Sequence, residues 1–81
     1  MATKQKDQQE LPKWFTGVLY TSGDVVTNPF TGASCVLTPA ELSMYDFIMG
    51  CSLTNRFPKE MAKGLTWFRR ANAEAYMILL D

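Results

Sequence analysis

Residues 57–71, FPKEMAKGLTWFRRA, show the clearest helical separation of apolar from basic side chains in this 81-residue chain. At about 100° per residue, one side of such a helix carries Phe57, Met61, Gly64, Leu65 and Phe68. The opposite side carries Arg56, Lys59, Lys63 and Arg70. The pattern predicts a helix that begins at Pro58, with one face in the core and one in solvent. Gly64, on the buried side, is the expected crossing point with a neighbouring helix.

A second helix is predicted just before it, from Pro39 to about Leu53. Thr38 supplies a cap, Pro39 occupies the first helical position, and Glu41 follows the cap by three residues, which is the arrangement of a capping box. Apolar residues surround most of the circumference of this segment. We therefore expect the helix to lie centrally and to be covered on more than one side.

The C-terminal run AYMILL, residues 75–80, is compatible with two structures. Asn72 is a good N-cap and Glu74 suits a first helical turn, which favours a short helix over 73–80. A strand over 76–80 is the alternative, because a short apolar run does not discriminate between the two by periodicity. If the domain does not bury this run, it forms an interface. The candidate apolar interface residues are Tyr76, Met77, Leu79 and Leu80.

Three short strands are predicted in the N-terminal half, over residues 14–20, 24–27 and 34–37, as an antiparallel meander. The turn NPFTG, residues 28–32, separates the last two. Pro29 presets φ, Asn28 can accept hydrogen bonds from the backbone ahead of it, and Gly32 supplies a left-handed residue. Phe30 either forms a candidate binding tip of this loop or folds back onto the sheet.

The expected fold class is therefore α+β, with a three-stranded antiparallel meander followed by two to three helices. Residues 1–12 are a polar leader that we expect to be mobile, either as an arm that orders on a partner or as a solubilising tail. Residues 13–81 form a single small domain.

Charge is unevenly distributed although the chain is neutral overall. Residues 14–55 contain three acidic residues and no basic one, whereas 56–71 contain five basic residues and one glutamate. Three interpretations of the basic helix face stay open: a solvated surface, a contact for an acidic protein, or a nucleic-acid contact in which an aromatic neighbour stacks on a base. The candidate partner-binding residues are Arg56, Lys59, Lys63, Trp67 and Arg70.

The chemistry-bearing residue types argue against an enzyme. The chain has no histidine, so it has no Ser-His or Cys-His pair, and its five glycines are too scattered for a phosphate loop. Cys35 and Cys51 are too few for a structural zinc site, so we expect no metal and no cofactor. Two reduced cysteines in a cytosolic-type compartment are favoured over a disulfide between them. The longest apolar run is too short to span a bilayer, so no membrane partner is expected.

The order of four segments over residues 25–81, NPFTG, LTPAE, YDFIMG and GLTWFRRANAEAYMILLD, resembles short uncharacterised proteins of tailed bacteriophages. The resemblance implies a viral origin, a location in the host-cell cytoplasm or in the virion, and a non-catalytic accessory role. The first functional hypothesis is protein–protein interaction with a host factor or a second copy. The alternatives are a nucleic-acid-binding module that uses the basic helix face and a minor virion structural component. No small-molecule substrate is indicated.

Overall fold

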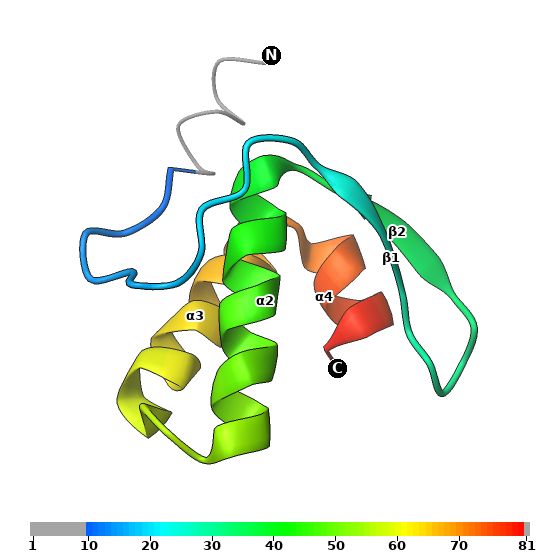
Figure 1. Ribbon diagram of the computed structural model, residues 1–81. Coiled ribbons are helices and arrows are strands. Elements are labelled where there is room, and N and C mark those ends of the chain that lie inside the picture. Colours follow the sequence, from blue (N-terminus) through cyan, green and yellow to red (C-terminus); the bar gives the residue numbers. More distant parts are fainter. Residues whose placement is uncertain (1–9, 81) are drawn as a thin grey trace.

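A two-stranded hairpin and three helices follow one another in the computed structural model, which describes residues 10–80 (Figure 1). Figure 1 shows α2 standing in the middle, with α3 on one side of it and α4 with the hairpin on the other. This confirms the α+β class with helices after strands. The elements are β1 (Asp24–Thr27), β2 (Ser34–Leu37), α2 (Pro39–Thr54), α3 (Pro58–Ala71) and α4 (Ala73–Leu79).

The hairpin is closed by the predicted NPFTG turn. β1 and β2 pair antiparallel, with Val25 opposite Val36. The Asn28 N–H donates to the Ala33 carbonyl oxygen at 2.8 Å, and the Asn28 Oδ1 accepts the Phe30 N–H at 2.8 Å. Gly32 adopts the left-handed conformation at φ 80°, which a residue with a Cβ adopts only at a cost in energy. The turn chemistry predicted from the sequence is confirmed.

The predicted strand over residues 14–20 does not form, so the meander has two strands within residues 10–80. This segment crosses α2 as irregular chain instead. The rings of Trp14 and Phe15 pack against Phe47 with centroid distances of 5.9 and 5.4 Å. The Tyr20 N–H donates to the Ser43 Oγ at 3.0 Å, on α2 and not on a neighbouring strand. The aromatic residues that favour a strand here serve as a cover for a helix.

The predicted leader, residues 1–12, is only partly within the structure, because residues 1–9 lie outside the described residues. Leu11 is half-buried against the hydrophobic core. The Pro12 carbonyl oxygen accepts the Phe15 N–H at 3.1 Å, which starts the turn that carries the chain onto α2.

The core forms where α3 crosses α2. Met44 and Ile48 of α2 and Phe68 of α3 are fully buried. A Cβ atom added at Gly64 would lie 3.0 Å from the Met44 Sδ and 3.3 Å from the Ile48 Cγ1. Gly64 is therefore the crossing point that the sequence predicts, because only its missing side chain lets the helices approach this closely.

Phe57 does not share the buried face of this helix, contrary to the prediction. It precedes the first turn as the N-cap of α3, with φ 55° and ψ 53°, and it is 53% exposed. The residue before a proline is disfavoured in the right-handed helical region, and here Phe57 takes the left-handed one. This conformation turns the ring outward, where the Arg56 guanidinium lies 5.8 Å from its centroid.

A buried carboxylate joins the ends of three helices. Glu41 is 2% exposed, and its Oε1 accepts the Thr38 N–H at 3.0 Å, which completes the predicted capping box. The same oxygen accepts the Asn72 Nδ2 at 3.2 Å. The Asn72 Oδ1 accepts the Ala75 N–H at 3.1 Å and so caps α4. The C-terminal run is thus the predicted short helix, and the strand alternative is wrong.

We predict that Gly64→Val destabilises the protein by about 2 kcal/mol, because the added methyl groups must displace fully buried Met44 and Ile48. Chemical denaturation followed by circular dichroism measures the change. Ala62→Val on the same helix is the matched control: Ala62 is exposed, so its cost should be only the helix-propensity term of about 0.5 kcal/mol. Equal losses in the two variants would contradict the close crossing.

We predict that Asn72→Ala lowers the free energy of unfolding by about 3 kcal/mol, since it removes both a helix cap and a donor to a buried carboxylate. Asn72→Ser separates the contribution of the helix cap from that of the bond to Glu41, because serine still caps a helix but lacks the amide donor. The serine variant should lose about 2 kcal/mol. Full stability in Asn72→Ser would show that the bond to Glu41 contributes nothing.

Candidate functional site

A hollow of about 760 Å³ lies on the outer side of α3. Lys63 and Arg70 lie about two turns apart on one stripe of the helix, with Thr66 between them. The predicted basic face therefore exists as a shaped surface, and part of its lining comes from outside the helix. The lining residues are Glu10, Lys63, Thr66, Trp67 and Arg70.

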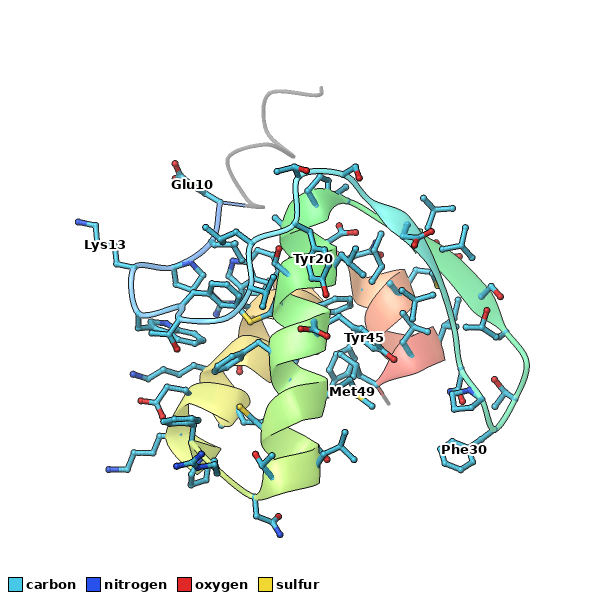
Figure 2. All side chains as sticks on the ribbon, in the orientation of Figure 1. Glu10, Lys13, Tyr20, Phe30, Tyr45 and Met49 are labelled. Carbon is cyan, nitrogen blue, oxygen red and sulfur yellow. The ribbon has the colours of Figure 1, made fainter. Side chains whose placement is uncertain are left out.

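Trp67 is half-buried in this hollow and is held by a bond that spans most of the chain. Its Nε1 donates to the Glu10 carbonyl oxygen at 3.1 Å. The bond fixes the plane of the indole and secures residues 10–12 beside α3. Figure 2 shows the Glu10 side chain projecting away from the body of the protein. Sequence reasoning missed Glu10, because its role rests on a backbone oxygen that carries no side-chain signal.

The hollow carries two cations, with the Glu10 carboxylate at its rim. Within residues 10–80, Lys63 and Arg70 have no ion-pair partner, and both are exposed. The Thr66 hydroxyl donates to the Ala62 carbonyl oxygen at 3.2 Å, so its proton is already used within the helix. The hollow therefore offers two positive charges and one aromatic ring to a ligand.

The other predicted basic residues lie elsewhere. Arg56 precedes α3 and lines a smaller hollow of about 170 Å³ with Met61 and residues at the end of α2. Lys59 is exposed and lines none of the hollows described here. Arg69 points toward α4, with its guanidinium 5.9 Å from the Tyr76 ring centroid. The structure thus brings together Lys63, Trp67 and Arg70 out of the five candidates.

Phe30 forms a second candidate site at the tip of the hairpin. Its side chain is 94% exposed, and Figure 2 shows it at the end of the turn, clear of the helices. It does not fold back onto the sheet. The Asn28 Nδ2 donates to the Ile78 carbonyl oxygen at 2.8 Å, which fixes the turn to the end of α4. An aromatic ring is therefore presented to solvent by a well-anchored loop.

Two valines form a further apolar surface on the hairpin, and the hydrogen-bonded hydroxyls of Thr27 and Ser34 lie between them and the tip. Val25 and Val36 lie opposite each other, and they are 57% and 74% exposed. Sequence reasoning placed them in a three-stranded sheet and did not identify them as surface. The alternation in SCVL, residues 34–37, contains the signal, since Leu37 is buried and Val36 must then point to the opposite face.

Most of the candidate C-terminal interface is packed against the core. Tyr76, Leu79 and Leu80 are half-buried in contact with it. Met77 is the exception and is 67% exposed. The domain therefore accommodates most of the apolar run by itself.

Both cysteines are free thiols. Burial raises the pKa of the Cys51 thiol, and the Glu60 carboxylate adds to the rise. Burial likewise raises the pKa of Cys35, with further contributions from Glu74 and Glu41. Each thiol therefore holds its proton at neutral pH, which disfavours a role as a nucleophile.

No group of three potential metal ligands occurs within the described part of the chain. Over the same residues, the structure contains no helix with the length and apolar character needed to cross a membrane. Comparison of the chain with protein-family models, with curated proteins and with solved structures gives no match.

We predict that stability falls as the pH rises above about 8.5, the ordinary thiol pKa. The unfolded chain ionises its thiols first, whereas the folded state keeps Cys35 and Cys51 protonated, so higher pH favours unfolding until the raised folded pKa values are passed. Urea denaturation across this range measures the slope. The double variant Cys35→Ala with Cys51→Ala should show a shallower slope. If the double variant loses stability with pH as steeply as the wild type, other titrating groups cause the loss.

Proposed function

We propose that this chain is a non-catalytic accessory protein that acts by binding another protein, with Phe30 as its anchor. The observation that carries the proposal is the 94% exposure of Phe30 on an anchored turn. A fully solvated phenylalanine contributes nothing to the core, so its burial against a partner would recover about 1.5–3 kcal/mol.

The anchoring of the turn favours tight binding. Partner association costs conformational entropy for each loop that must become ordered. Here the Asn28 side chain already accepts the Phe30 N–H and donates to the Ile78 carbonyl oxygen. The ring is thus held on a loop that is preorganised before the partner arrives. Aromatic residues of this kind dominate the energetics of protein interfaces when they fill a pocket.

The exposed valines add an apolar surface to the same hairpin that presents the anchor. Val25 and Val36 lie on the outer face of the same hairpin. Interface anchors are most effective when neighbouring contacts exclude water from them. The fitting partner is a protein with an apolar pocket for Phe30 and a flat apolar rim for the valine pair.

The sequence resemblance to short tailed-phage proteins supports an accessory role in an infected cell, with a host protein as partner. The resemblance assigns no role to any residue, so the support for the Phe30 site comes from the hairpin alone. Association of two copies, as in a minor virion component, is the competing outcome that the experiment separates.

We predict that Phe30→Ser weakens partner binding and leaves the unfolding transition unchanged, because the exposed side chain makes no packing contribution. Photocrosslinking with p-benzoylphenylalanine at position 30, in infected or host extract, identifies the partner. The purified partner is then titrated with wild-type and variant protein, and Phe30→Ser should weaken its binding at least about 30-fold, the effect of a hot-spot residue.

Leu53→Ser is the matched control, since Leu53 is comparably exposed at the end of α2. Its affinity for the same partner should equal that of the wild type. Sedimentation velocity of wild type against Phe30→Ser tests the second-copy outcome. Equal affinity of Phe30→Ser and wild type for the crosslinked partner would refute Phe30 as the anchor. If the wild type forms dimers and Phe30→Ser does not, the partner of the Phe30 surface is a second copy of this chain and not a host protein.

A further inference from the structure

We infer that the hollow on α3 is a binding site for single-stranded nucleic acid. In this assignment the Trp67 indole stacks on one base, and Lys63 and Arg70 contact phosphates on either side of it. The site lies on α3 and shares no residue with the hairpin, so the inference does not rest on the role proposed for Phe30.

Helical spacing places the ring between the two charges. Trp67 follows Lys63 by four residues and precedes Arg70 by three, so all three share one face. Lys63 and Arg70 are then separated by about 10 Å along the helix axis. A single strand of nucleic acid that runs along α3 could therefore contact a cation, an aromatic ring and a second cation in turn.

The indole is a preorganised stacking surface. Its Nε1 donates to the Glu10 carbonyl oxygen at 3.1 Å, which fixes the ring before any ligand arrives. Because this N–H is already engaged, it is not available to read the edge of a base. Recognition through the ring face alone is tolerant of sequence, as is usual for proteins that bind single strands by stacking.

The ring also favours nucleic acid over an acidic peptide. Carboxylates would contact the two cations but not the face of the indole, whereas a nucleotide can use both the cations and the ring face. The hollow of about 760 Å³ has room for a base and its sugar. The Glu10 carboxylate, the acidic group at the rim, projects away from the body of the protein (Figure 2).

Two phosphate contacts predict weak binding with a definite salt dependence. For single strands the logarithm of the affinity falls with the logarithm of the salt concentration with a slope of about −0.7 per neutralised phosphate. Two contacts give about −1.4, or roughly a sevenfold loss between about 50 and 200 mM salt. A larger slope would require cations beyond those of the hollow.

The test uses the fluorescence of Trp67 in a Trp14→Phe background, which leaves one tryptophan. The probe is an oligothymidylate of about 8 nucleotides. We expect quenching that saturates, with the salt dependence given above. Absence of quenching and of retention on immobilised oligothymidylate at low salt would overturn the inference.

A pair of adjacent arginines provides the sharpest control. Arg70→Gln and Arg69→Gln remove the same charge from neighbouring exposed positions, but the Arg69 guanidinium lies over the Tyr76 ring and not in the hollow. Arg70→Gln and Lys63→Gln should each weaken binding about fivefold and lower the slope by about 0.7. Arg69→Gln should change neither quantity beyond about twofold.

Equal effects of Arg69→Gln and Arg70→Gln would mean that net charge attracts the strand and that the hollow is not the site. An oligoglutamate peptide that binds as tightly, with the same dependence on Lys63, would reassign the hollow to acidic proteins. Phe30→Ser should leave oligothymidylate binding unchanged, so failure of one proposal is distinguishable from failure of the other.

Discussion

The buried carboxylate of Glu41 constrains the arrangement of the whole domain. A buried charge is tolerated only when its hydrogen bonds are made, and two of those of Glu41 come from the Thr38 backbone and from the side chain of Asn72. Thr38 lies at the junction of β2 with α2, and Asn72 lies at the junction of α3 with α4. Separating the two junctions would break the bond from Asn72 to the buried carboxylate, so this bond helps to hold α4 beside the hairpin.

The position of α4 then determines the direction of the hairpin. Asn72 caps the start of α4, and the carbonyl oxygen of Ile78 near its end accepts the Asn28 side chain from the NPFTG turn. One short helix therefore connects the buried polar centre to the exposed tip. The presentation of Phe30 depends in this way on residues that are distant from it in sequence and lie inside the molecule.

Local rules account for what could be predicted from the sequence. The capping box at Thr38, the NPFTG turn and the Asn72 cap each depend on a few neighbouring residues, and each formed as expected. The predicted strand over 14–20 does not form, because a strand needs a neighbouring strand to pair with. Its aromatic residues pack instead against Phe47 on α2. The basic face was predictable by periodicity, but the hollow was not, since the Trp67 bond to Glu10 joins residues that are 57 positions apart.

The separation of the α3 hollow from the hairpin tip follows from the same packing. α2 is apolar around most of its circumference and needs cover on both sides, so α3 occupies one side while α4 and the hairpin occupy the other (Figure 1). The basic hollow belongs to α3 and the aromatic tip to the hairpin, and they have no residue in common. The basic residues of α3 therefore lie on the side away from the exposed valines. A chain of this size can then carry two chemically different surfaces, because its central helix keeps them apart.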